Sequence, residues 1–115
     1  MDCLVKLFKA LSDPTRLRIV YLLLNAGGEL CICEILEAIK IPQYNVSKHM
    51  KELKNAGLAK ERKEGRFVYY SLAECCGGFT GKIFKTLKTA DNQVFIKDLK
   101  HLKKKFPDRT CRNCA

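Results

Sequence analysis

The sequence lacks an apolar run long enough to cross a bilayer, because runs such as Ile19 to Leu24 are far shorter than the roughly 20 residues that a membrane helix needs. The amino terminus also lacks a basic segment followed by an apolar stretch, so no secretory signal is visible. Internal repeats and low-complexity segments are missing as well. We therefore expect one cytoplasmic domain without a membrane partner, since 115 residues can bury one core but not two.

Acidic residues are scarce relative to basic ones. The chain has 12 Asp and Glu against 22 Lys and Arg, which gives a net charge of +10. Such an excess favours an anionic partner, and nucleic acid is the usual one. The basic excess is larger in residues 82–109 than in residues 42–70, so charge alone does not identify the segment that contacts DNA.

Cysteine, by contrast, is abundant, with seven residues in a short chain. In a reducing compartment we expect these thiols to be metal ligands or redox groups rather than structural disulfides. Two of them have one residue between them, two are adjacent, and two have two residues between them in a Cys-X-X-Cys motif. In that order the pairs are Cys31 and Cys33, Cys75 and Cys76, and Cys111 and Cys114, and Cys3 stands alone.

The spacing of apolar residues predicts mainly helices with one β-hairpin. The predicted helices cover residues 2–11, 14–25, 31–39, 42–55 and 81–106. Between the last two, the apolar period changes to two in residues 58–63 and 67–72, which predicts a hairpin turning at Glu64-Gly65.

This order of elements is that of a winged helix-turn-helix domain. We assign the domain to residues 1–106 and treat residues 107–115 as a flexible, Cys-containing tail. The first and last predicted helices are hydrophobic and contain several Phe residues. We therefore expect a homodimer whose interface is formed by these two helices.

The fourth predicted helix has the pattern of a DNA-reading element. Val46, Met50 and Leu53 fall on one face, and polar or basic side chains fall on the other. The hairpin that follows adds more basic side chains, as a wing that contacts a neighbouring groove or phosphates would. The candidate DNA-binding residues are Gln43, Tyr44, Asn45, Ser47, Lys48, Lys51, Arg62, Lys63 and Arg66. His49 lies near the apolar face and is expected to pack, whereas His101 is expected to be solvated.

Four blocks of the sequence, at residues 10–19, 29–35, 45–58 and 65–70, resemble in this order the ArsR/SmtB family of metalloregulatory repressors. The resemblance spans about residues 4 to 106. It implies a homodimeric repressor that binds double-stranded operator DNA and leaves it when a toxic ion binds, and not an enzyme with a small-molecule substrate. Pro42 stands where the family usually has a Ser-like helix cap, and Pro offers no capping side chain.

Cys31 and Cys33 resemble both the arsenic site and the cadmium/lead site of that family, and thiophilic ions prefer thiolates. The arsenic type can have a third Cys where this chain has Leu36, and the cadmium/lead type uses more amino-terminal cysteines than Cys3 alone. The resemblance implies As(III) or Sb(III) as the effector, with Cd(II), Pb(II) or Zn(II) as alternatives. The possible further ligands are Cys75, Cys76, Cys111, Cys114 and Cys3.

Two other functions stay open for the same thiols. A redox or persulfide sensor would cross-link two cysteines on the same DNA-binding body. A thiol oxidoreductase using Cys111 and Cys114 is disfavoured, because no βαβ pattern holds that pair at a helix amino terminus.

The spacing also suggests a release mechanism. Side chains two residues apart on a helix point about 200° away from each other. If the third helix begins at Cys31, one ion can hold both Cys31 and Cys33 only when its first turn is distorted. That distortion would be passed to the DNA-reading helix just after it.

Overall fold

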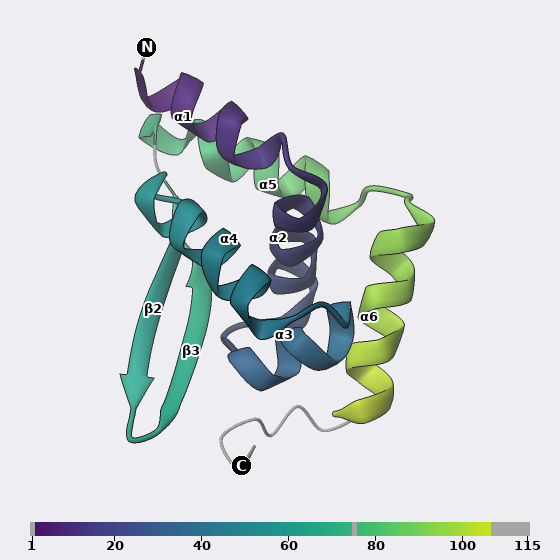
Figure 1. The fold of residues 1–115 in the computed structure, drawn as a ribbon. Coiled ribbons are helices and arrows are strands. Elements are labelled where there is room, and N and C mark those ends of the chain that lie inside the picture. Colours follow the sequence, from purple (N-terminus) through teal and green to yellow (C-terminus); the bar gives the residue numbers. More distant parts are fainter. Residues whose placement is uncertain (1, 75, 107–115) are drawn as a thin grey trace.

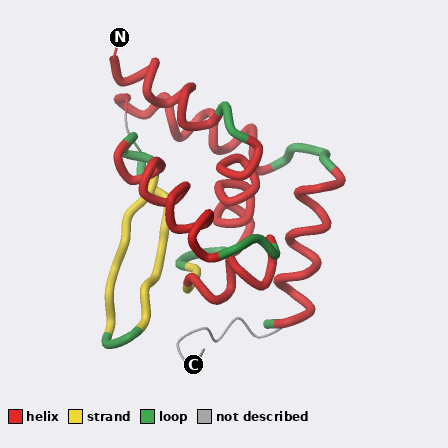
Figure 2. The backbone as a smooth tube through the Cα atoms, in the orientation of Figure 1, coloured by secondary structure: helices red, strands yellow, loops and turns green. Residues whose placement is uncertain are grey.

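The computed structural model describes residues 2–74 and 76–106 (Figures 1 and 2). Its elements are α1 (Asp2–Leu11), α2 (Pro14–Ala26), β1 (Leu30–Cys31), α3 (Ile32–Ile39), α4 (Gln43–Asn55), β2 (Ala59–Glu64), β3 (Phe67–Leu72), the 3-10 turn η1 (Cys76–Gly78), α5 (Phe79–Lys88) and α6 (Gln93–Lys105). The fold is mainly helical with a small sheet, which confirms the predicted fold class. Cys75 and the predicted tail, with Cys111 and Cys114, lie outside the described residues.

The core forms where α2, α3 and α4 pack together, with α2 running through the middle of the molecule (Figure 1). Leu22 of α2 and Ile35 of α3 are fully buried. The predicted inward face of α4 is confirmed, because Val46, Met50 and Leu53 are at most 1% exposed. Burial of this face directs the opposite, polar side of α4 to solvent.

Local sequence signals set the ends of the two longest early helices. Asp13 caps α2, its carboxylate accepting a hydrogen bond of 3.1 Å from the Arg16 amide, and Pro14 occupies the first turn. Gly27 ends α2 with φ of 79°, a conformation that favours glycine. α4 follows Pro42, which makes no side-chain capping bond, as the sequence indicated.

The sheet has three antiparallel strands in the order β1-β3-β2. β2 and β3 form the predicted hairpin, which extends away from the helices in Figure 1. β1 was not expected, because Leu30 and Cys31 qualify as a strand only through their pairing with Tyr70 and Tyr69. The prediction that Cys31 begins a helix is therefore wrong.

The single last helix predicted for residues 81–106 is also wrong. The chain breaks after Lys88, and Asn92 restarts it by accepting hydrogen bonds from the amides of Val94 and Phe95. α5 then lies beside α1, with the rings of Phe8 and Phe79 6.3 Å apart (Figure 1). α6 packs on α2 and α3 instead, so α5, and not the last helix, is the neighbour of α1.

α6 is held to the rest of the fold by both apolar and polar contacts. Phe95 stacks on Tyr21 with ring centroids 4.7 Å apart. The buried Asp98 carboxylate accepts two hydrogen bonds from Arg18, of 2.8 and 2.9 Å. Helices of the described chain are all too short or too polar to span a membrane.

Candidate nucleic-acid interface and thiol site

The outer face of α4 presents the predicted polar residues to solvent. Tyr44 is the most exposed large apolar side chain of the described chain, at 77%. Lys48 and Lys51 stand on the same exposed side. The remaining exposed candidates on α4 are Gln43, Asn45 and Ser47. Hydroxyl, amide and ammonium groups on one helix face are suited to contacts with base edges and phosphates.

His49 faces inward and joins α4 to the corner between α1 and α2. Its Nδ1 lies 3.3 Å from Arg16 Nη1 and 3.7 Å from Asp13 Oδ2. Arg16 also donates a hydrogen bond of 2.6 Å to the Ala10 carbonyl. The packed, hydrogen-bonded role expected for His49 is confirmed, and its contacts fix how α4 sits on the body of the fold.

Asp13 at this corner has a lowered pKa. Burial by itself raises it, but the hydrogen bond from the Arg16 amide and the nearby charges of His49 and Arg16 outweigh burial. Asp13 therefore stays anionic over a wider pH range than an isolated carboxyl group.

The hairpin of β2 and β3, here called the wing, contains the three predicted basic residues, and each of them has different surroundings. Arg66 is exposed at the tip of the hairpin. Lys63 Nζ lies 3.9 Å from Glu61 Oε2. Arg62 donates to Glu29 at 2.8 and 2.9 Å and to Glu64 at 2.7 Å, which raises its pKa, and its guanidinium lies 4.6 Å from the centre of the Tyr69 ring. Arg62 is thus engaged within the protein, and a DNA phosphate would have to compete for it.

Cys31 and Cys33 are brought together, with their sulfur atoms 2.9 Å apart. Cys31 has the extended angles φ −72° and ψ 151° and precedes α3, and its amide donates a hydrogen bond of 3.0 Å to the Glu34 carboxylate. Cys33 lies in the first turn of α3. Because Cys31 is not helical, the sulfurs meet without any distortion of the helix, and the premise of the predicted unwinding step, that Cys31 is helical, is wrong.

Cys31 is a thiol, whereas Cys33 is disulfide-bonded in the structure, so both sulfurs could bind a thiophilic ion only in the reduced protein. Cys31 is buried, at 1% exposed, and Cys33 is half-buried. The amino end of α3 carries a partial positive charge that favours anionic groups such as a metal-bound thiolate. Within residues 2–74 and 76–106, no group of three or more His, Cys, Asp or Glu could hold a metal ion. Further ligands for this pair would have to come from elsewhere.

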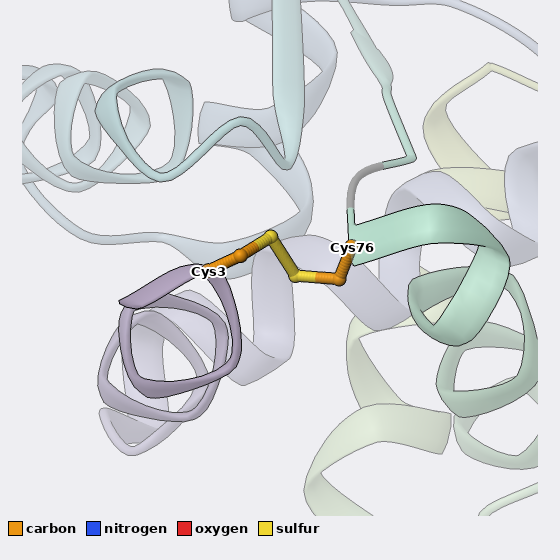
Figure 3. Close-up of a disulfide and its surroundings, with 2 residues drawn as sticks. All are labelled: Cys3 and Cys76. Carbon is orange, nitrogen blue, oxygen red and sulfur yellow. A yellow bond between two sulfur atoms is a disulfide. The ribbon is translucent and has the colours of Figure 1, made fainter. Parts of the chain in front are cut away.

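A second pair of cysteines is joined covalently. Cys3 and Cys76 form a disulfide with an S–S distance of 2.05 Å, which ties α1 to the turn before α5 (Figure 3). The expectation that the cysteines would not form disulfides is therefore wrong for this pair, and it is also wrong for Cys33, which is disulfide-bonded. Cys3 and Cys76 were possible further ligands, but neither sulfur is available as a thiolate while the bond is intact.

His101 is not solvated as expected. Its Nδ1 lies 3.1 Å from the Ala38 carbonyl near the end of α3, and the side chain is half-buried. The lysine-rich sequence around it hides this contact, which depends on α6 packing over α3.

The fold is that of a winged helix-turn-helix protein, because it combines a helical core, an exposed polar face on α4 and a hairpin. Proteins of this class are DNA-binding transcriptional regulators rather than enzymes. Residues 13–61 match the family described as "Bacterial regulatory protein, arsR family". The chain belongs to this ArsR family.

The relatives include one protein named for cadmium resistance and one named for arsenical resistance. The chain is 52% identical over 67 residues to the cadmium resistance transcriptional regulatory protein CadC homolog of Staphylococcus aureus, covering 58% of this chain and about half, 54%, of that protein. It is 42% identical over 79 residues to the arsenical resistance operon repressor of Escherichia coli, covering 69% and 67%. Among solved structures, HlyU from Vibrio cholerae matches with a TM-score of 0.66 at 29% identity, over 75% of this chain and 88% of that one.

Proposed function

We propose that the protein is a transcriptional repressor that binds operator DNA as a homodimer and is released when As(III) or Sb(III) binds the thiolates of Cys31 and Cys33. The observation that supports this most is the 2.9 Å separation of the two sulfur atoms at the start of α3, the helix that precedes α4. Cys33 is disulfide-bonded in the structure, so the proposal applies to the reduced protein. Such a protein acts where the chromosome is, so we place it in the cytoplasm. We assign DNA binding and effector binding to residues 1–106.

Arsenite and antimonite are preferred over divalent ions because of the number of sulfurs. Cd(II), Pb(II) and Zn(II) in a thiolate site of this type would call for four sulfurs, two more than Cys31 and Cys33 supply. A trivalent ion needs fewer thiolates, so fewer further sulfur ligands would have to come from Cys75, Cys111 or Cys114. The relative from Escherichia coli is named for arsenical resistance and that from Staphylococcus aureus for cadmium, so cadmium is the runner-up.

DNA binding is proposed for the exposed face of α4 and the wing. In the dimer, two copies of α4 would enter major grooves about one helical turn apart on a partly palindromic duplex. Ser47, Lys48 and Lys51 are placed to contact bases and phosphates.

The dimer interface is proposed for α1 and α5. Val5, Phe8 and Phe79 are large apolar residues that are 43%, 53% and 41% exposed. They lie on these two neighbouring helices, and a second copy of the chain that covers them would bury apolar surface that is otherwise in water.

DNA release by a panel of effectors tests the proposal. The reduced protein on a labelled operator duplex is titrated with arsenite, antimonite, cadmium, lead, zinc and hydrogen peroxide. Release by arsenite and antimonite at the lowest concentrations is the expected result. Release by cadmium alone would establish the runner-up, and release by none of these ions would contradict the proposal.

A second candidate function, redox sensing, is favoured by the disulfide between Cys3 and Cys76. Hydrogen peroxide would take two electrons from the two thiols, forming the S–S bond and two water molecules. If this bond controls DNA binding, peroxide changes the operator affinity of the wild type in the absence of metal, whereas Cys3→Ser does not respond. Equal responses of the two proteins would exclude it.

A further inference from the structure

A hollow between α1 and the carboxyl-terminal half of α4 contains basic side chains that are not part of the proposed DNA interface. Its volume is about 290 Å³, and Lys6 and Lys9 of α1 contribute to its lining. The other lining residues are Ala10, Arg16, Glu52, Asn55 and Ala56. Three basic side chains against the carboxylate of Glu52 give this hollow, here called the α1–α4 hollow, a net charge of +2.

Arg16 is the fixed cation of the α1–α4 hollow. Its Nε donates to the Ala10 carbonyl at 2.6 Å, and its Nη1 lies 3.3 Å from Nδ1 of His49 on α4. Asp13 also lies at this corner, 3.7 Å from His49 Nδ1, but its carboxylate caps α2. The half-buried guanidinium of Arg16 is therefore held in one place between α1 and α4.

Lys6 and Lys9 differ from the basic residues of the wing in having no carboxylate beside them. Both side chains are exposed, and neither ammonium group forms an ion pair within residues 2–74 and 76–106. On the wing, Arg62 and Lys63 lie 2.8 and 3.9 Å from carboxylate oxygens. The positive charge of the α1–α4 hollow is therefore more available to an external anion than that of these two wing residues.

The α1–α4 hollow borders the DNA-reading face of α4 on the side away from the wing. Lys54 Nζ lies 3.0 Å from Glu61 Oε1 of β2, so the Lys54 side of α4 faces the wing. Glu52 is two residues earlier, about 200° around the helix, and it lines the hollow. Lys48 and Lys51 are exposed on the surface between these two sides.

The shape of the DNA major groove gives the physical reason for a contact here. The groove is about 12 Å wide, admits one α-helix and is bordered by a phosphate backbone on each side. If α4 enters the groove with Lys48 and Lys51 toward the bases, the wing lies beside one backbone and the α1–α4 hollow beside the other. Contacts from basic side chains to phosphates fix the position of a protein on the duplex.

We propose that Lys6 and Lys9 bind the phosphate backbone that borders the major groove on the side away from the wing, with the fixed charge of Arg16 behind them. This inference rests on the DNA binding of the proposed function and adds α1 to the DNA interface. The same helix can also serve the proposed dimer, because Phe8 packs against Phe79 of α5 whereas Lys6 lines the α1–α4 hollow.

A salt titration of the double variant Lys6→Ala, Lys9→Ala tests the inference. Binding of the full-length protein to a labelled operator duplex is measured by fluorescence anisotropy at several salt concentrations, without effector. Loss of two phosphate contacts is expected to weaken binding by about 10-fold. The slope of the logarithm of the binding constant against the logarithm of the salt concentration should become shallower by about two. A duplex of unrelated sequence should be bound more weakly by the same factor, because phosphate contacts do not read sequence.

The double variant Lys97→Ala, Lys100→Ala is the matched control, because it removes two exposed ammonium groups from α6, outside the hollow. Its salt slope is expected to equal that of the wild type, and sedimentation shows whether both double variants keep the oligomeric state of the wild type. A wild-type slope in Lys6→Ala, Lys9→Ala would overturn the role of the α1–α4 hollow and leave the proposed function standing. A wild-type protein that binds neither duplex would overturn the proposed function itself.

Chemical acetylation of lysines in the wild type is a second measurement that does not depend on the folding of a variant. Bound operator duplex is expected to protect Lys6 and Lys9 from acetylation, as it protects Lys48, and to leave Lys97 and Lys100 reactive. Mass spectrometry of the digested protein measures the labelling of each lysine. Equal labelling of Lys6 and Lys9 with and without DNA, while Lys48 is protected, would overturn the inference.

Discussion

At the scale of single residues, Lys48 tests whether the exposed face of α4 reads DNA. Lys48→Ala is expected to weaken operator binding. If the Lys48 ammonium group contacts only a phosphate, the slope of the logarithm of the binding constant against the logarithm of the salt concentration becomes shallower by about one. Lys100→Ala is the matched control, because it removes the same charge from the exposed side of α6. Titrations at several salt concentrations measure both. Unchanged affinity in a Ser47→Ala, Lys48→Ala double variant would count against α4.

Asp13 makes a pH-dependent contribution to stability. Its pKa is lowered in the folded protein from an ordinary value of 3.8, because the Arg16 amide bond and nearby positive charge outweigh burial. A group with a depressed folded pKa stabilises the fold above its unfolded pKa, and this stabilisation is lost as the pH falls through the folded pKa. Asp13→Ala, which removes the helix cap, is expected to cost about 1 kcal/mol at pH 7.

Asp13→Asn separates the charge from the cap, because Asn retains an oxygen that can accept from the Arg16 amide. The difference in unfolding free energy between the wild type and Asp13→Asn should be present at pH 7 and shrink below about pH 4. Urea unfolding at both pH values measures it. A difference that grows as the pH falls would show that the assigned sign of the pKa shift is wrong.

At the scale of elements, the sequence predicted the helices and strands correctly where several local signals agree. For α2, the Asp13-Pro14 start, the apolar spacing and the Gly27 end all indicate the same helix, and the structure has it at Pro14–Ala26. For α4, three apolar residues at helical spacing fixed which side is buried. The hairpin strand predicted for residues 58–63 was displaced by a single residue, to Ala59–Glu64.

The sequence was insufficient where structure depends on distant contacts. Cys31 is extended because it pairs with Tyr69, which lies far along the chain, and a scan for local periodicity cannot detect such pairing. This affects the candidate site directly, since the separation of the Cys31 and Cys33 sulfurs follows from that extended residue. The disulfide of Cys3 with Cys76 has the same origin, because only the packing of α1 beside α5 brings these residues together.

The break between α5 and α6 was missed although a local signal exists. Apolar residues at helical spacing occur on both sides of it, as Phe84 and Leu87 and then Phe95 and Leu99, and so the pattern reads as continuous. Asn92 is among the residue types preferred at a helix start, and this was the available clue.

Asp98 tests how firmly α6 is held to α2. Its carboxylate is 2% exposed and is paired with Arg18, so Asp98→Leu would leave a half-buried guanidinium without this partner. We expect a loss of about 3 kcal/mol in unfolding free energy, measured in urea. Arg18→Leu combined with Asp98→Leu should lose less than the sum of the single changes. Additive losses would show that the two side chains do not stabilise the fold as a pair.

At the scale of the whole molecule, the apolar patch on α1 and α5 tests the proposed dimer. Phe8→Glu places a charge within this patch, beside Phe79, and is expected to shift sedimentation at micromolar concentration from dimer to monomer. Val94→Glu is the matched control, because Val94 is 49% exposed but lies on α6. If Phe8→Glu remains a dimer and Val94→Glu becomes a monomer, the interface involves α6 and the proposed interface on α1 and α5 is wrong.

The central claim is that an ion held by Cys31 and Cys33 lowers the affinity for DNA. The most direct measurement is the operator dissociation constant, by fluorescence anisotropy, of reduced wild type, Cys31→Ser and Cys33→Ser with and without arsenite. We predict equal affinities without arsenite, at least about 5-fold weakening of the wild type with arsenite, and no weakening of either variant. A full response to arsenite in Cys31→Ser or Cys33→Ser would contradict the account.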